Sequence, residues 1–197
     1  MIERRPRIGI TGSAGTGKTS LAATLSHLLG LPVRAEGMRD RLAAGFDPHS
    51  LSRDGHRRMI AGDADDLALD LARDRGGLIT DRTPLDMAAF WLANGFGVDD
   101  PAATEALLAR AVCAMADYDL VVLLPWGEHP IAADGIRSPN PWLQLHFQTV
   151  LEGLCHRYVA PRRLLTITGK APVTAVASLV RDRMSAGVGA GRADASP

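Results

Sequence analysis

Residues 12–19 have the spacing of a loop that binds phosphate groups. They read Gly-Ser-Ala-Gly-Thr-Gly-Lys-Thr and satisfy the pattern G-x-x-x-x-G-K-[ST] in full. In such a loop, backbone N–H groups converge on one point, the lysine reaches the outer phosphates and the last hydroxyl binds Mg²⁺. We therefore expect Lys18 to contact the phosphates of ATP and Thr19 to bind Mg²⁺. The residues expected to surround the nucleotide are Gly12, Ser13, Ala14, Gly15, Thr16, Gly17, Lys18, Thr19 and Ser20.

The segments on either side of this loop are the ones that its chemistry requires. Residues 7–11 form a short apolar run that suits a buried strand, and residues 20–29 place four leucines on one face of a predicted helix. A strand that enters a glycine-rich loop before a helix aims backbone N–H groups at one point, and the helix N-terminus adds partial positive charge there. The flanking pattern thus supports a functional phosphate loop over a chance match.

The rest of the chain alternates apolar runs with helical patterns. This alternation predicts an α/β fold, a three-layer sandwich around a parallel sheet of five strands. We expect one domain over residues 1–184 and a disordered tail over residues 185–197. The later strands are expected at 32–36, 77–81, 119–124 and 163–168, with helices near 60–71, 107–115 and 143–158 and a last helix that begins at Pro172.

The composition is that of an ordinary globular protein. Among 197 residues, 46% are hydrophobic, and 22 acidic residues balance 22 basic ones, so no overall positive field favours nucleic acid. The two cysteines form no metal-type pair, and the histidines lack ligand spacing. No segment approaches the about 18 apolar residues of a membrane span. We expect a reduced, cytoplasmic setting, with either a monomer or a homodimer.

Two acidic residues follow predicted strands and should share the edge of the sheet with the loop. In open parallel sheets, chemistry gathers where the strands end. Asp81 ends an apolar strand and is the better candidate for the Mg²⁺ shell, because the strand at 119–124 runs into Pro125 without an acid. The alternative for Asp81 is a capping or turn acid before Thr83.

Glu36 is the second acid of this edge. If a helix starts there, Glu36 and Arg39 lie three residues apart and can face one cleft. The carboxylate could then accept the proton of an attacking hydroxyl, and the arginine could hold the substrate. The alternative is a solvated acid beside a surface arginine.

Residues 126–141 form a long loop rich in glycine and proline after the strand at 119–124. Long loops at this edge are often lids, so Asp134 is a candidate to bind substrate and Arg137 to neutralise the transferring phosphoryl group. The alternative is a surface loop with a turn at Asp134. A basic cluster at residues 53–58 could touch phosphate or nucleic acid, although a solvated helix face explains it better.

Together these motifs resemble those of the P-loop nucleoside-type kinases. The similarity is greatest to the AAA-type ATP-binding family that contains the nicotinamide riboside kinase domain of bacterial NAD-regulating proteins, over about residues 7 to 170. It is carried by the loop, Glu36-x-x-Arg39, Asp81-Arg82 and the Asp-Gly-Ile-Arg run that ends at Arg137. The resemblance implies the strand order 2-3-1-4-5, ATP and Mg²⁺ as cofactors, Glu36 as the base, Asp81 linked to Mg²⁺, and Arg82 and Arg137 on phosphates.

The predicted function is a Mg-ATP-dependent kinase that phosphorylates a hydroxyl of a nucleoside-like or nucleotide-like acceptor. Two alternatives stay open at this stage. One is a kinase that acts on a polynucleotide, at a hydroxymethylpyrimidine in DNA or at a 5′-hydroxyl, and so serves DNA modification. The other is a regulatory ATP-binding switch. Residues 46–58 do not identify an acceptor, and the Arg-Thr-Pro run after Asp81 matches no nicotinamide-specific signature.

Overall fold

Five parallel strands form a single sheet in the computed structural model, which describes residues 5–47, 50–128 and 140–190. The strand order is β2-β3-β1-β4-β5, which confirms the predicted fold class and topology. The strands are β1 (Arg7–Thr11), β2 (Val33–Arg34), β3 (Leu78–Asp81), β4 (Leu120–Leu123) and β5 (Leu164–Thr166).

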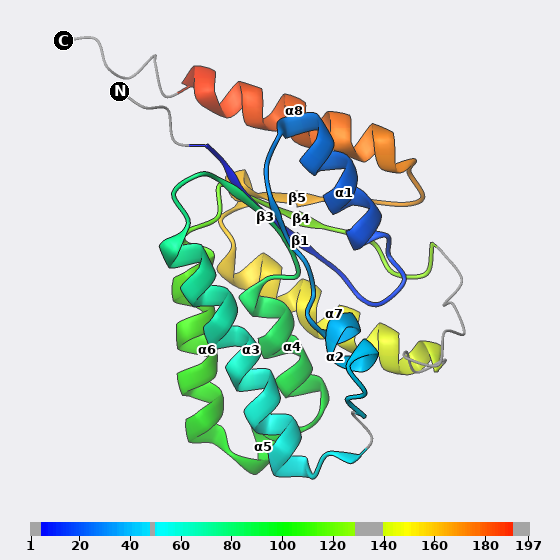
Figure 1. The fold of residues 1–197 in the computed structure, drawn as a ribbon, viewed down its shortest axis with the longest axis vertical. Helices are drawn as coiled ribbons and strands as arrows, with labels where there is room; N and C mark the ends of the chain where they lie inside the picture. Colours follow the sequence, from blue (N-terminus) through cyan, green and yellow to red (C-terminus); the bar gives the residue numbers. More distant parts are fainter. Residues whose placement is uncertain (1–4, 48–49, 129–139, 191–197) are drawn as a thin grey trace, which may run out of the picture.

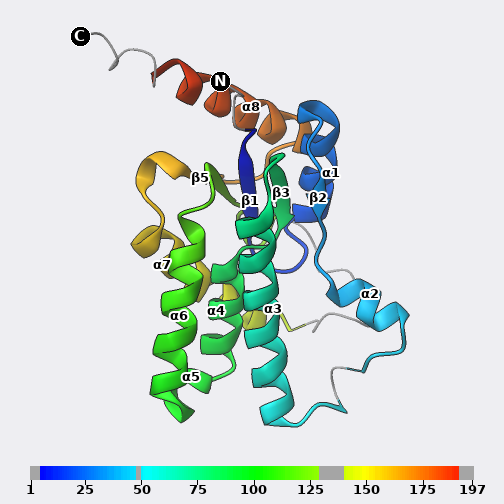
Figure 2. The same ribbon diagram turned by 60° about the vertical axis from the view of Figure 1, so that its left-hand side comes forward.

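Helices cover both faces of the sheet and complete three layers (Figure 1). One layer contains α1 and α8, and the other contains α3, α4, α6 and α7, as the turned view in Figure 2 also shows. The helices are α1 (Lys18–Leu29), α2 (Met38–Ala43), α3 (Arg53–Arg73), α4 (Pro84–Ala93), α5 (Phe96–Asp99), α6 (Pro101–Met115), α7 (Pro141–Tyr158) and α8 (Val173–Ala190), with a 3₁₀ turn η2 (Pro161–Arg163).

The two hydrophobic layers follow from the alternation of side chains along the strands. In β4, Val121 and Leu123 join the core on the side of α4 and α7, whereas Leu120 and Val122 join the core beneath α1 and α8. All four side chains are buried, which explains why this strand reads as an uninterrupted apolar run. The sheet is therefore a rigid platform on which the loops at its carboxyl edge are mounted.

Helix α4 lies at the centre of its layer, in contact with α3, α6 and α7. The sequence patterns did not predict it, because it is apolar on nearly all sides and has no polar face to reveal a helical period. Its N-terminus approaches β1 so closely that a Cβ on Gly9 would lie 2.7 Å from Cγ2 of Thr83. Glycine at position 9 thus lets α4 start directly beside the end of β1.

Several boundaries differ from the predictions. The strand expected at 32–36 is only two residues long. Pro172 precedes α8, and its carbonyl accepts hydrogen bonds from the N–H groups of Ala175 and Val176. Helix α8 continues to Ala190, beyond the domain boundary placed at residue 184, and residues 191–197 lie outside the described residues. Within the described ranges, every helix is too short or too polar to cross a membrane.

Candidate active site

The phosphate loop joins the buried strand β1 to α1. Its backbone needs glycine at three positions, because φ is +146° at Gly12, +79° at Gly15 and +88° at Gly17. A Cβ on Gly12 would also lie 3.1 Å from the carbonyl oxygen of Leu124. The loop therefore packs tightly against the end of β4, and its shape depends on residues that have no side chain.

Lys18 is the first residue of α1, and its side chain is buried within the loop. The Nζ group donates a hydrogen bond of 2.7 Å to the carbonyl oxygen of Ser13. Burial, and then the nearby positive charge of Arg82, lower the pKa of Lys18 to about 8. The ammonium is thus held by the loop itself in an unfavourable environment that an anion would relieve.

Thr19 and Asp81 meet, although they come from different elements. The Thr19 Oγ1 hydroxyl donates a hydrogen bond of 2.6 Å to Oδ2 of Asp81. The other carboxylate oxygen of Asp81, Oδ1, is buried and has no hydrogen-bond partner among the described residues. Buried polar atoms are nearly always satisfied, so an orphaned acceptor here marks a place for a donor such as a water in a Mg²⁺ shell.

These residues fit Mg²⁺ held jointly by protein and nucleotide. A hydroxyl and a carboxylate are hard oxygen ligands of the kind that Mg²⁺ prefers. In the described ranges, no group of three histidine, cysteine or acidic side chains forms a complete metal cage. The Thr19 hydroxyl and the Asp81 carboxylate would therefore hold the ion together with phosphate oxygens and water.

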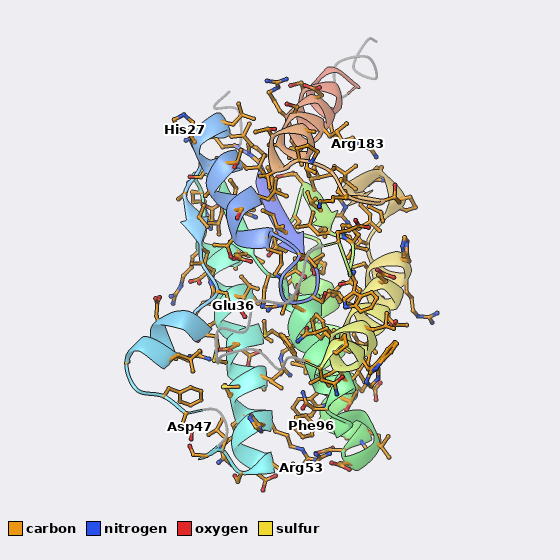
Figure 3. The ribbon with its side chains drawn as sticks, turned by 90° about the vertical axis from the view of Figure 1, so that its right-hand side faces the viewer. His27, Glu36, Asp47, Arg53, Phe96 and Arg183 are labelled. Atoms are coloured by element: carbon orange, nitrogen blue, oxygen red, sulfur yellow. The ribbon has the colours of Figure 1, made fainter. Side chains whose placement is uncertain are left out.

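Glu36 lies on the chain between β2 and α2, at the level of the phosphate loop (Figure 3). Its Oε1 accepts a hydrogen bond of 2.6 Å from Nε of Arg82, and its side chain is 31% exposed. The buried Arg82 guanidinium also donates to Oδ1 of Asp86 at 3.2 Å and lies 4.9 Å from the ring centre of Phe90. Burial lowers the pKa of Arg82, but Glu36 and Asp86 outweigh burial and raise the pKa.

Arg82 is the sole non-glycine residue with a positive φ, +98°, in the part of the chain that the structure describes. Such a backbone costs roughly 1–3 kcal/mol and persists only where the surroundings enforce it. Here the Arg82 N–H donates to the carbonyl of Ile10 at 2.9 Å, and the Arg82 guanidinium donates to the Asp86 carboxylate. These two hydrogen bonds hold the strained residue and its buried guanidinium at the edge of the sheet.

Asp86 organises this edge and was not predicted as a site residue. It is fully buried, and its Oδ2 accepts from Thr11 Oγ1 at 2.7 Å and from the N–H and Oγ1 of Thr83 at 2.7 and 2.9 Å. Thr83 and Asp86 form the capping box of α4. The Thr-x-x-Asp spacing before an apolar helix was the signal in the sequence.

Three predicted residues cannot be placed in the site. Helix α2 begins at Met38, after Glu36, so the assumption that Glu36 and Arg39 share a helix is wrong. Arg39 lies in α2, and its side chain is not among those described. Most of the predicted lid at 126–141, including Asp134 and Arg137, lies outside the described residues.

The basic cluster at residues 53–58 lies away from the phosphate loop. Arg53 and Arg57 both pair with Asp99, and both guanidinium groups stack on Phe96, at 4.6 and 5.2 Å from the ring centre. Figure 3 shows Arg53 and Phe96 together at the end of the molecule remote from the loop. Part of this cluster is therefore neutralised within the protein.

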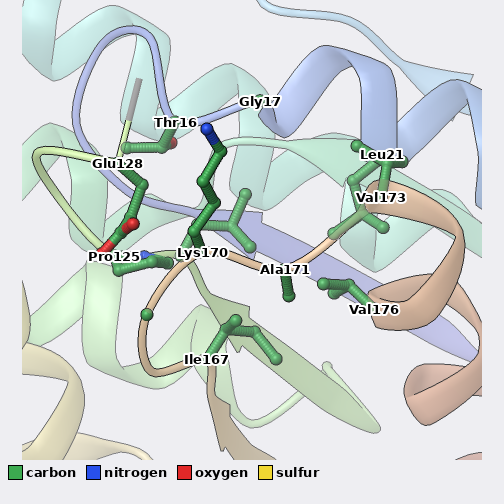
Figure 4. A pocket seen from close by; sticks show the side chains of 12 residues that line it. Thr16, Gly17, Leu21, Pro125, Glu128, Ile167, Lys170, Ala171, Val173 and Val176 are labelled. Atoms are coloured by element: carbon green, nitrogen blue, oxygen red, sulfur yellow. The ribbon is translucent and has the colours of Figure 1, made fainter. Parts of the chain in front are cut away.

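A pocket adjoins the phosphate loop at Thr16 and Gly17 (Figure 4). Its remaining walls come from α1, the residues after β4, the connection from β5 to α8 and the first turn of α8. The apolar lining residues are Leu21, Leu124, Pro125, Ile167, Ala171, Val173 and Val176, with Glu128, Gly169 and Lys170 beside them. A largely apolar pocket beside a phosphate site suits a flat nucleotide base. The sequence patterns did not reveal these residues, because they are scattered over four segments.

A phosphate loop after the first strand and the sheet order 2-3-1-4-5 define a P-loop nucleotide-binding fold of the nucleotide-kinase type. A family model described as an AAA domain matches residues 7–170, and the chain belongs to this family. A search of curated proteins found no match.

Solved structures show the same fold at low sequence identity. The structure of NadR protein in complex with NAD and AMP-PNP superimposes with a TM-score of 0.61 and 18% identity over 92% of this chain and 50% of the other. This chain thus spans half the length of that protein. Deoxyadenosine kinase from M. mycoides with bound dCTP superimposes with a TM-score of 0.65 and 17% sequence identity, over 91% of this chain and 99% of the other. Shikimate kinase from Acinetobacter baumannii superimposes with a TM-score of 0.63 and 17% sequence identity, over 93% of this chain and 94% of the other.

Proposed function

We propose that this protein is a Mg-ATP-dependent kinase that transfers the γ-phosphoryl group to a hydroxyl of a small nucleoside-like or nucleotide-like acceptor. The observation that carries the proposal is the gathering at one sheet edge of a phosphate loop, two buried cations and a partly exposed carboxylate. Phosphoryl transfer depends on such positioning and charge stabilisation rather than on covalent chemistry by the protein.

The phosphate loop and Lys18 would bind the triphosphate. On arrival of the phosphates, the Lys18 ammonium would exchange its bond to Ser13 for phosphate oxygens, which restores its ordinary preference for the charged form. The Thr19 hydroxyl and the Asp81 carboxylate would hold Mg²⁺, which when bound neutralises charge on the β- and γ-phosphates. The orphaned Oδ1 of Asp81 supports this role.

Glu36 would accept the proton of the attacking hydroxyl. It is the acid of this edge that is both held in place, by Arg82, and accessible to a substrate. Arg82 would orient Glu36 and stabilise negative charge that develops during transfer, because its guanidinium is buried and remains charged. Arg39, Asp134 and Arg137 remain predictions from the sequence.

The pocket beside Thr16 would receive the base of the donor nucleotide. Its apolar walls match a purine, and Glu128 and Lys170 offer polar contacts. The AMP-PNP complex of a protein with this fold supports ATP as the donor.

A small acceptor is favoured over a polynucleotide. The pairing of Arg53 and Arg57 with Asp99 leaves less free charge for a nucleic-acid backbone, whose binding depends on many unpaired cations. A regulatory switch would need neither a base at Glu36 nor an accessible acceptor side. No specific observation favours either alternative.

An acceptor screen read by mass spectrometry tests the proposal. Wild-type protein and the Lys18→Met variant are incubated with Mg-ATP and separate nucleosides, nucleotides, small alcohols and oligonucleotides. We expect an acceptor mass increase of one phosphate with wild type alone. ATP hydrolysis without transfer to any acceptor would instead favour the switch, and transfer only to oligonucleotides would favour the polynucleotide kinase.

A further inference from the structure

Gln148 in α7 is almost completely buried and joins three parts of the chain. Its Oε1 accepts a hydrogen bond of 2.7 Å from the backbone N–H of Ser13. Its Nε2 donates to the carbonyl oxygen of Leu124 at 3.0 Å and to Oε1 of Glu152 at 2.8 Å. One neutral amide thus satisfies a backbone donor in the phosphate loop and a backbone acceptor just after β4.

The peptide that Gln148 holds is the one that holds Lys18. The N–H of Ser13 binds Gln148, and the carbonyl oxygen of the same residue accepts the Lys18 ammonium at 2.7 Å. Leu124, whose carbonyl Gln148 also binds, lines the pocket beside the phosphate loop. The position of Gln148 therefore affects both the resting place of Lys18 and a wall of the pocket.

Gln144 makes a second, weaker contact one helical turn earlier. Its Oε1 accepts from the N–H of Ala14 at 3.3 Å, in a part-buried position. The two glutamines lie four residues apart, so they share one face of α7. Neither bond uses the N–H groups from residue 15 onward, at the part of the loop that opens α1 and would cradle phosphate.

We propose that Gln148, assisted by Gln144, is a positioning residue for the donor nucleotide: it fixes the phosphate loop and the end of β4 in the arrangement that binds triphosphate and base together. This inference rests on the proposed function. The requirement is chemically narrow, since the site needs one acceptor and two donors on one uncharged side chain. Glutamate would lose both donors beside Glu152, and methionine would lose all three bonds at similar volume.

The test measures the Kd of Mg-AMP-PNP by calorimetry for Gln148→Met, Gln148→Glu and Gln144→Ala. Cys155→Ala is the matched control, because Cys155 is likewise buried in α7 but packs among the apolar side chains of the core. Thermal unfolding of every variant shows how far each substitution weakens the fold. Binding is compared only at temperatures at which a variant is folded.

We expect both Gln148 variants to raise the Kd by a factor of roughly ten, the size of one lost hydrogen bond, and Gln144→Ala to raise it less. Cys155→Ala should lower the unfolding temperature and leave the Kd unchanged. Wild-type affinity in Gln148→Glu or Gln148→Met, or an equal loss in Cys155→Ala, would overturn the inference. If Gln148→Met does not fold, the Kd values of Gln144→Ala, at a part-buried position, and of the near-isosteric Gln148→Glu still test the inference. Absence of any nucleotide binding by wild type would instead overturn the proposed function as well.

Discussion

Two buried arginines, Arg7 and Arg82, lie at opposite edges of the same sheet and are held in different ways. Each is 6% exposed. Arg7 starts β1 at the amino edge, and Arg82 follows β3 at the carboxyl edge. Both belong to networks of charged side chains, so the difference between the networks shows what each edge is for.

The Arg7 network is satisfied within the protein. Its side chain donates to Oδ2 of Asp74 at 3.0 Å, to the carbonyl of Asp74 at 2.6 Å and to Asp117 at 3.3 Å. Its backbone N–H binds Oδ2 of Asp119 at 2.8 Å. These bonds tie the ends of α3 and α6 to the first strand, and they need no ligand.

The network around Arg82 is incomplete without a ligand. Arg82 has a strained backbone, the pKa of Lys18 is lowered, and one oxygen of Asp81 has no partner among the described residues. The disfavoured Lys18 ammonium and the unpartnered Asp81 oxygen cost stability that an anion with Mg²⁺ would recover. The comparison shows that the buried charges at the amino edge are paired within the protein, whereas those at the carboxyl edge leave a polar atom unpartnered among the described residues, as the proposed function requires.

The largest expected effect is that of Lys18→Met. We expect phosphoryl transfer to fall by about 10³-fold or more, in the range of a lost phosphate-binding cation. The ligand-free variant should nevertheless unfold at a temperature no lower than wild type, because burial disfavours the ammonium and methionine keeps the apolar stem. Turnover assays and thermal unfolding measure the two effects. Near-normal transfer in the folded variant would contradict the role of the loop.

Glu36→Gln and Asp81→Asn separate the two acids. As a general base, Glu36 should contribute ~10² to 10⁴-fold, so its amide variant should lower kcat steeply and keep ATP affinity. Asp81→Asn should instead raise the Mg²⁺ concentration needed for half-maximal rate and be partly rescued by more Mg²⁺. Steady-state kinetics over a range of Mg²⁺ concentrations distinguish these patterns. Equal losses below about tenfold in both would leave neither acid with its assigned role.

Arg7→Met should damage the fold and leave nucleotide binding intact. Removing one partner of a buried ion pair costs about 3–5 kcal/mol, and the partial exposure of Asp74 places this pair near the lower value. Burial raises the pKa of Asp74, but the hydrogen bond and charge of Arg7, together with the hydrogen bonds from the N–H groups of Gly76 and Gly77, outweigh it and the net pKa is lowered. The stabilisation is therefore present at neutral pH and is lost as the pH falls below the ordinary pKa of 3.8. Urea unfolding of both proteins at neutral and acidic pH checks this, and an unchanged midpoint at neutral pH would contradict it.

The smallest effect is a pH dependence of nucleotide affinity. Lys18 is protonated below its pKa of about 8, and above that pH the phosphates must bind with uptake of a proton. The affinity for AMP-PNP should therefore be constant below that pH and fall by up to about tenfold per pH unit above it. Lys18→Arg, which stays charged, should remove this slope. Binding measured from about pH 7 to 9.5 tests it, and identical slopes in both proteins would exclude Lys18 as the titrating group.

The sequence predicted the strands and the position of the phosphate loop, because apolar runs and a spaced motif are local patterns, whereas the sheet order was implied by the resemblance to the P-loop nucleoside-type kinases. It also predicted that Asp81 lies at the same sheet edge as the phosphate loop, because parallel strands end at one edge. Gln148 and the pocket around Ile167 could not be predicted, since their contacts join segments more than twenty residues apart. Asp86 was overlooked because its capping box precedes a helix without a polar face.

The most direct test is calorimetric titration of Mg-AMP-PNP into wild type, Lys18→Met and Arg7→Met, each at a temperature at which it is folded. We expect one saturable site in wild type and in Arg7→Met, and at least about tenfold weaker binding in Lys18→Met. Equal affinity in wild type and Lys18→Met, or a greater loss in Arg7→Met than in Lys18→Met, would contradict a ligand-binding carboxyl edge and a structural amino edge.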